Sequence, residues 1–322
     1  MTMTTLQPKN TFARMGFALV AGSIASVLAS LFVLAPIATQ ENLQKLIELI
    51  GPSLVLLLTY IPQIAVLLVF CLFVMHMPKE DREKESMSFR TLFRIFMMMY
   101  AVSSVLQLIG QVISRAAPAG GTEQLDLLGS IVSTKLLGGI LIPVLLAPVV
   151  EELIFRKLML DRIRMYGEKN AILFSALCFG LFHGNLTQFL FAFSVGLFLG
   201  YVYCKTGKVL YTMIMHILLN ALSTSLLLIV PLFASDNSAS KALAAVAGIL
   251  LLLFIAFMVV DGVILLIRKI KSREIRLDNS MQSCIPQGEI LKTVYLNIGV
   301  ILFFVLSFVS IVTGLLNISL PF

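Results

Sequence analysis

Long apolar segments recur along the chain, and this feature limits its fold more than any other. Uncharged or nearly uncharged stretches occur at 15–40, 52–77, 95–114, 127–150, 170–204, 209–233, 242–267 and 293–322. A helix that crosses a bilayer needs about 20 mainly apolar residues. The stretch 170–204 is long enough for two short passes, with a break near Gly184-Asn185. The segments therefore predict an all-α, polytopic transmembrane helix bundle of nine spans, with eight as the alternative count.

The composition excludes several other classes of protein. Of the 322 residues, 59% are hydrophobic and 13% are charged, whereas soluble domains carry about 25% charged residues. A soluble globular enzyme, a disordered chain and a disulfide-stapled secreted domain are therefore excluded. The net charge of +7 reflects Lys and Arg in the loops of a membrane protein, so we expect a lipid bilayer and no nucleic acid as partner.

The basic residues lie in alternate loops. Lys and Arg are concentrated before the first span and at 78–94, 156–169, 205–208 and 268–276, whereas the loops between these hold few of them. Because basic loops stay on the cytoplasmic side of a membrane, the pattern predicts a cytoplasmic N-terminus and an external C-terminus. The absence of an organelle targeting sequence favours the plasma membrane of a bacterium.

Three parts of the chain differ in their content of polar motifs. Residues 1–126 are expected to form N-terminal transmembrane helices, and 234–322 to form C-terminal transmembrane helices with a basic cytoplasmic loop. The central part, 127–233, contains the polar clusters described below. It also contains the pair Gly196 and Gly200, whose spacing predicts close helix packing.

The first polar cluster is Glu151-Glu152…Arg156, which directly follows an apolar run. On a helix, Glu152 and Arg156 share a face and can pair, whereas Glu151 points elsewhere. One carboxylate is then neutralised and the other is free to act. Two carboxylates in different environments can take different chemical roles.

Two further clusters lie inside apolar helices. They are Phe179…His183 and His216…Asn220, each with a spacing of four residues. Burying His and Asn in hydrocarbon without partners costs several kcal/mol, so we expect these side chains to meet one another and the glutamates. A Glu with two His can bind zinc, and it can equally activate water while His and Asn donors stabilise an oxyanion.

The motifs E-E-x-x-x-R, F-x-x-x-H and H-x-x-x-N, in this order, resemble those of the CPBP family. This family comprises the CAAX proteases and bacteriocin-processing enzymes and is also called the Abi family. The Ras-converting CAAX endopeptidase belongs to this family. The resemblance covers residues 127–233 and implies an intramembrane endopeptidase that hydrolyses a peptide bond. The substrate would be a prenylated peptide, a leader peptide or another membrane protein.

The resemblance also implies a role for each motif residue. Glu151 would activate water together with His183, Glu152 would be held by Arg156 and orient the site, and His216 with Asn220 would stabilise the oxyanion. Family members are commonly described as metalloproteases, and a glutamate-dependent, metal-free mechanism is the alternative. If zinc is used, Glu151, His183 and His216 are the predicted ligands. The chain has no H-E-x-x-H motif, which would favour zinc.

Two other functions compete with the protease. The first is a catalytically inactive membrane scaffold or a bacteriocin self-immunity protein, in which the polar residues only hold helices together. The second is a secondary transporter with a Glu and His proton relay. A transporter would show internal repeats with interrupted helices in both halves, whereas the Glu, Arg and His clusters described above all lie in the central part of this chain.

Overall fold

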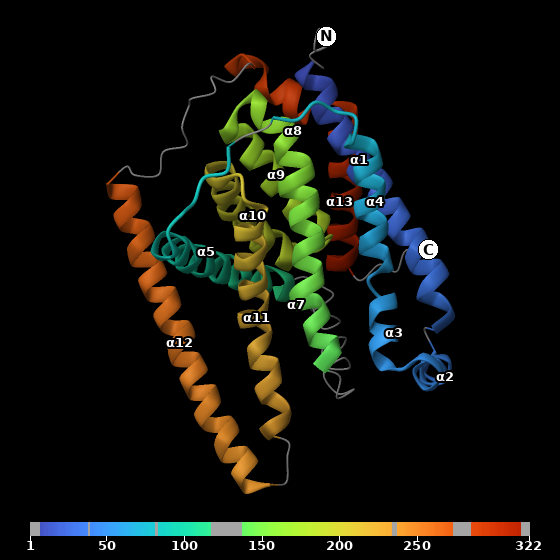
Figure 1. Ribbon diagram of the computed structural model, residues 1–322, viewed down its shortest axis with the longest axis vertical. Helices are drawn as coiled ribbons and strands as arrows, with labels where there is room; N and C mark the ends of the chain where they lie inside the picture. The colour runs from blue at the N-terminus through green and yellow to red at the C-terminus, as the bar shows by residue number, and fades with distance from the viewer. Residues whose placement is uncertain are drawn as a thin grey trace.

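The fold is built from helices, as the apolar segments predict. The computed structural model describes residues 7–37, 39–80, 83–116, 137–233, 237–272 and 285–316, and in these ranges the regular structure is helical (Figure 1). The α-helices are α1 (Pro8–Val33), α2 (Gln40–Ile50), α3 (Pro52–Leu58), α4 (Ile61–Val74), α5 (Phe89–Ala116), α7 (Leu137–Glu152), α8 (Asp161–Ile163), α9 (Glu168–Phe182), α10 (Leu186–Thr206), α11 (Val209–Phe233), α12 (Ser238–Lys271) and α13 (Ile298–Leu316). Short 3₁₀ helices lie at Ala35–Ile37, Arg164–Tyr166 and Gln287–Glu289, and π-helices lie at Leu153–Leu160 and Leu291–Tyr295.

The chain is a multi-pass membrane protein, but the predicted count of nine spans is not confirmed. In the described ranges five helices are long and apolar enough to cross a membrane, namely α1, α5, α10, α12 and α13. Helix α4 and residues Val209–Ser225 of α11 are apolar but shorter. Helix α9 has 15 residues, which corresponds to about 22 Å against a hydrocarbon core of about 30 Å. Apolar sequence therefore continues in helices that are too short to be counted as spans.

The predicted break near Gly184-Asn185 separates α9 from α10. Gly184 has a positive φ of 67°, which glycine adopts without strain. Asn185 then caps α10, because its side-chain oxygen accepts a hydrogen bond from the backbone N–H of Gln188 at 2.8 Å. The two helices pack against each other, and His183 at the break lines one cavity with Glu151 of α7, while Phe179 of α9 contacts His216 of α11.

Small residues allow the α9–α10 pair to approach closely. A Cβ atom added at Gly196 would lie 2.8 Å from Cα of Ala176, and one added at Gly200 would lie 3.2 Å from the side chain of Ile172. The close packing predicted from the Gly196 and Gly200 spacing is therefore confirmed. Helix α10 is the partner against which the site helix α9 is held.

Helices α1 and α13 touch where Ala13 and Gly16 of α1 meet Gly299 at the start of α13, and they diverge beyond this contact. A Cβ atom at Gly299 would clash with the backbone of Ala13, and one at Gly16 would clash with the backbone of Gly299. Farther along, α1 runs away from α13 (Figure 1). The two helices thus form a wedge that is closed at one end.

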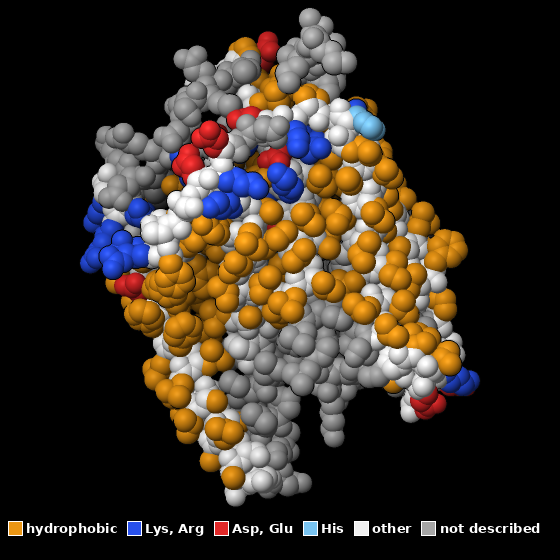
Figure 2. All heavy atoms as spheres, in the orientation of Figure 1, with side chains coloured by type: hydrophobic (Ala, Val, Ile, Leu, Met, Phe, Trp, Pro, Cys, Tyr) orange, Lys and Arg blue, Asp and Glu red, His pale blue; other side chains and the backbone are white. Residues whose placement is uncertain are grey.

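The surface is divided between charged and apolar regions. In Figure 2, most of the visible Lys, Arg, Asp and Glu side chains gather towards one end of the molecule, and hydrophobic side chains cover the middle. The longest helix, α12, exposes Leu250, Leu253, Phe257 and Val260. An apolar belt below a charged end is the surface expected of a protein in a bilayer. The predicted domain boundaries at 126/127 and 233/234 fall in or beside the stretches 117–136 and 234–236, which lie outside the described residues.

Candidate active site

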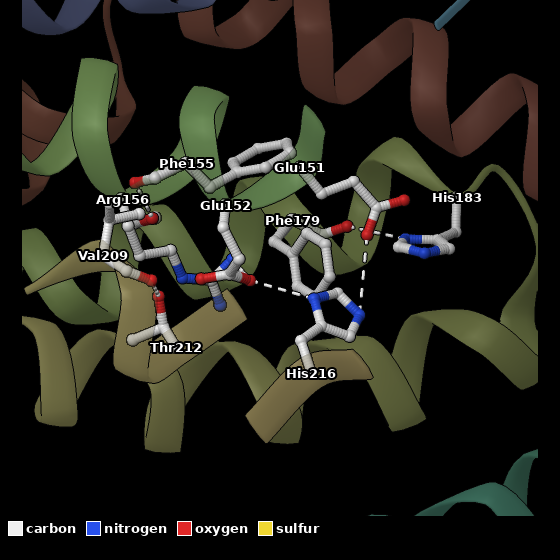
Figure 3. Close-up of polar contacts among 10 residues, drawn as sticks. Glu151, Glu152, Phe155, Arg156, Phe179, His183, Val209, Thr212 and His216 are labelled. Atoms are coloured by element: carbon white, nitrogen blue, oxygen red, sulfur yellow. Dashed lines mark hydrogen bonds and ion pairs between the residues drawn. The ribbon is translucent and has the colours of Figure 1, made fainter. Parts of the chain in front are cut away.

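Glu152, at the end of α7, is the centre of a buried ionic cluster. Its side chain is 0% exposed, and its Oε1 atom lies 3.0 Å from Nη1 of Arg156. The same oxygen accepts a hydrogen bond of 2.9 Å from Nδ1 of His216, on α11 (Figure 3). The predicted pair between Glu152 and Arg156 is therefore present, and His216 completes it. The cluster ties α11 to the end of α7.

The backbone changes its helical type where this cluster forms. The predicted helix continues after Glu152, but Leu153–Leu160 is a π-helix. Short π-helical segments occur frequently at functional sites. The residues remain on one face, because Arg156 still reaches Glu152. The sequence pattern does not distinguish an α-helix from a π-helix over these residues.

Phe179, on α9, is the apolar centre of the site. The guanidinium carbon of Arg156 lies 4.8 Å from the centroid of its ring, a distance at which a cation is attracted to the ring face. The ring also makes edge contacts with His183 and His216, at centroid distances of 5.0 and 5.7 Å. This explains the aromatic residue in the second motif, since one ring supports the cation and both imidazoles.

Glu151 points away from the buried cluster. Its side chain is 15% exposed, whereas that of Glu152 is fully buried. Its Oε2 atom lies 3.6 Å from Nε2 of His216. In Figure 3 the carboxylate of Glu151 lies between the rings of His183 and His216. The two adjacent glutamates therefore have the different environments that the sequence predicts.

His183 is oriented by its own helix. Its Nδ1 atom lies 2.8 Å from the carbonyl oxygen of Phe179. Because a carbonyl oxygen only accepts hydrogen bonds, Nδ1 is the donor of this pair. Nε2 is the ring nitrogen that remains for a water molecule or a substrate.

A cavity of about 450 Å³ lies next to Glu151 and His183. Its size is within the range of ligand pockets. The neutral polar side chains in its wall are Ser23 and Ser26 of α1, Gln63 of α4, Gln188 of α10, and Ser307 and Ser310 of α13. Three of these four helices lie outside the predicted central part of the chain. The sequence analysis missed these residues, because single Ser and Gln residues in apolar helices form no motif. Only Gln63 could have been noticed, since it is the one amide side chain in the otherwise apolar helix α4.

Asn220 lies one helical turn after His216 but faces a different space. It lines a neighbouring cavity of about 180 Å³ together with Gln107, Thr187 and Gln188. Gln188 lines both cavities. The structure thus brings Glu151, Glu152, Arg156, His183 and His216 into one cluster and places Asn220 in the adjacent cavity.

The structure describes all three predicted zinc ligands, Glu151, His183 and His216. Among the described residues there is no group of three or more His, Cys, Asp or Glu side chains arranged to hold a metal ion. Nδ1 of His183 bonds Phe179, and Nδ1 of His216 bonds Glu152. Histidine ligands of zinc commonly hold such a hydrogen bond on one ring nitrogen and bind the metal with the other. The zinc alternative therefore stays a prediction, with Glu151 and the Nε2 atoms of His183 and His216 as its ligands.

A known protein family matches the part of the chain that contains this cluster. Residues 133–222 match the family described as type II CAAX prenyl endopeptidase, Rce1-like. The match includes all six predicted site residues, from Glu151 to Asn220. The resemblance to the CPBP family is confirmed. The CPBP-type residues fall inside the predicted central part, 127–233. No curated protein and no solved structure matches the chain.

Proposed function

We propose that the protein is an intramembrane endopeptidase that cleaves a membrane-associated peptide, such as a prenylated or leader peptide. The family match supports protease activity, since the matched family is one of endopeptidases. The observation that carries the mechanism is the contrast between Glu151, which lines a cavity with His183, and Glu152, which is buried against Arg156. Only Glu151 is accessible to a water molecule and a substrate.

In the proposed mechanism, a water molecule lies between Glu151 and Nε2 of His183. Glu151 accepts a proton from this water as the oxygen attacks the substrate carbonyl carbon. The tetrahedral intermediate then collapses, the C–N bond breaks, and the proton passes to the leaving amine. General base catalysis of this kind contributes about 10²–10⁴-fold to the rate.

The proposed oxyanion site uses His216 and Asn220, as the family resemblance implies. Glu152 fixes His216 by accepting the hydrogen bond from Nδ1, so that Nε2 faces the side where Glu151 lies. Hydrogen bonds donated by a ring N–H to a carboxylate orient histidines in many enzymes. To donate a second hydrogen bond from Nε2 to the oxyanion, His216 would act in its doubly protonated form. The oxyanion would then lie between the two cavities, towards Asn220.

The wedge between α1 and α13 supports entry of the substrate from the bilayer. Val27 of α1 and Leu306 of α13 both line the cavity, and they are 53% and 46% exposed, respectively. A peptide anchored in the membrane could therefore reach Glu151 without crossing water. The gathering of charge at one end supports the proposed orientation, with the N-terminus in the cytoplasm of a bacterial cell.

A peptide library tests the protease against an inactive scaffold or self-immunity protein. The purified protein in lipid is incubated with CAAX-type and bacteriocin-leader peptides, and products are identified by mass spectrometry. We expect cleavage by the wild type, loss of cleavage in Glu151→Ala, and cleavage that survives a chelator. Equal cleavage by Glu151→Ala would contradict the mechanism, and inactivation by the chelator would favour the zinc alternative.

A further inference from the structure

The cavity next to Glu151 has one wall that the catalytic motifs do not supply. This wall comes from α1, α4 and α13, and its polar members are Ser23, Ser26, Gln63, Ser307 and Ser310. These helices lie outside the residues that match the family, 133–222. All five side chains are neutral and can form hydrogen bonds. A wall of this kind fits a ligand that is itself neutral and polar.

Gln63 is the most informative residue of this wall. Its Oε1 atom is buried and has no hydrogen-bond partner in the described part of the chain. The other buried side-chain atoms of this kind belong to the ion pairs of Glu152 with Arg156 and of Glu80 with Arg164, or to Tyr295. Of all these, only Gln63 lines the cavity next to Glu151. A buried acceptor without a partner is costly, so its partner is expected to arrive with a ligand.

Gln188, from α10, lines the same cavity. Its Oε1 atom accepts a hydrogen bond of 2.9 Å from Nδ2 of Asn185. Asn185 is itself fixed, because it caps α10 and donates to the carbonyl oxygen of His183. With Oε1 engaged, the NH₂ group of Gln188 remains as the donor. The turn that carries His183 therefore also positions a carboxamide donor.

We propose that Gln63 and Gln188 bind the backbone of the substrate peptide, with Gln63 accepting one backbone N–H and Gln188 donating to one backbone carbonyl. This inference rests on the proposed endopeptidase function. A peptide group has one donor and one acceptor, so an acceptor and a donor that line one cavity complement it. Recognition of the backbone, and not of a particular side chain, would let the site accept peptides of different sequence.

Backbone substitution tests the contact made by Gln63. The probe is a fluorescent farnesylated CAAX peptide, together with analogues in which one non-scissile amide at a time is replaced by an ester, which removes the N–H. Binding is measured in lipid nanodiscs in the inactive Glu151→Gln background. We expect one ester analogue to bind about tenfold more weakly than the parent. Adding Gln63→Met should weaken the parent by a similar factor and abolish the effect of that ester.

Two further variants make the result specific. Gln188→Met should weaken the parent peptide but preserve the ester effect, because it removes a different hydrogen bond. Gln111→Met is the matched control, since Gln111 lies in α5 and lines neither cavity; its binding should equal that of the background. An ester effect that persists unchanged in Gln63→Met, or no binding of any peptide by the folded protein, would overturn the proposal.

The thermal stability gives a readout that needs no substrate. If Gln63 serves the substrate, Gln63→Met in the wild-type background should unfold at the same temperature as the wild type or higher, because it removes a buried acceptor without a partner. A clear decrease would indicate a structural role and overturn the proposal. The proposed function fails separately, if Glu151→Gln cleaves peptides as fast as the wild type.

Discussion

The two sides of the active-site cluster differ in what their charges contact. On the buried side, Glu152 meets Arg156 and His216 and has no exposed surface. On the cavity side, Glu151 and His183 line a space of about 450 Å³. Both sides begin at adjacent residues of one helix. The comparison shows two adjacent glutamates in different environments, one fully buried in an ion pair and one at the edge of a cavity.

The buried side gives the largest expected effect on stability. Arg156→Met leaves the charge of Glu152 without its main partner, and breaking one side of a buried ion pair costs about 3–5 kcal/mol. We expect a strong decrease in the unfolding temperature and in the yield of folded protein. The measurement is thermal unfolding in detergent, monitored by intrinsic fluorescence.

The double variant Glu152→Gln with Arg156→Met sharpens this prediction. Because it removes both charges, it should be more stable than Arg156→Met alone. Arg90→Met is the control, since Arg90 is exposed near the start of α5, and its unfolding temperature should equal that of the wild type. Equal stability of Arg156→Met and the wild type would show that the buried side is not structural.

A substitution at the contact between α1 and α13 should have an intermediate effect on stability. Gly299→Val forces a side chain against the backbone of Ala13, and overpacking of this kind costs about 1–3 kcal/mol. We expect a lower unfolding temperature and slower cleavage, because the cavity is lined by both helices. Gly314→Val is the matched control on α13, where an added Cβ meets nothing within 4 Å. Similar losses in the two variants would contradict a close contact at Gly299.

The cap of α10 gives the smallest effect on stability. Asn185→Ala removes the N-cap and should cost about 1 kcal/mol, and it also releases the carboxamide of Gln188. We therefore expect a higher KM for the cleaved peptide along with a small decrease in unfolding temperature. Asn237→Ala removes the comparable cap of α12 and should lower stability without changing KM. An equal rise in KM for both variants would contradict a specific contribution of Asn185 to substrate binding.

The sequence predicts those parts of the structure that depend on local chemistry. The helices, the break at Gly184-Asn185 and the pair between Glu152 and Arg156 all follow from patterns within a few residues of one another. The grouping of His183 and His216 with the glutamates follows from the cost of burying them alone. These features were accessible because each one is determined by burial, charge or a turn in its own segment.

Other features depend on contacts between distant segments. The proposed role of Gln63 requires α4 to pack beside α7, and the wedge requires Gly16 to meet Gly299. Neither contact has a local sequence pattern. The number of spans was also difficult to predict, because apolar residues occur equally in long helices and in short ones such as α9. Residues 117–136, which include part of one predicted span, lie outside the described residues.

The most direct test of this account compares Glu151→Gln with Glu152→Gln in the same lipid preparation. Peptide cleavage and the unfolding temperature are measured on each sample, and rates are normalised to the folded fraction. We predict that Glu151→Gln keeps the wild-type unfolding temperature and loses about 10²–10⁴-fold in cleavage rate, whereas Glu152→Gln loses stability. A Glu151→Gln variant that cleaves at the wild-type rate would contradict the assignment of Glu151 as the general base.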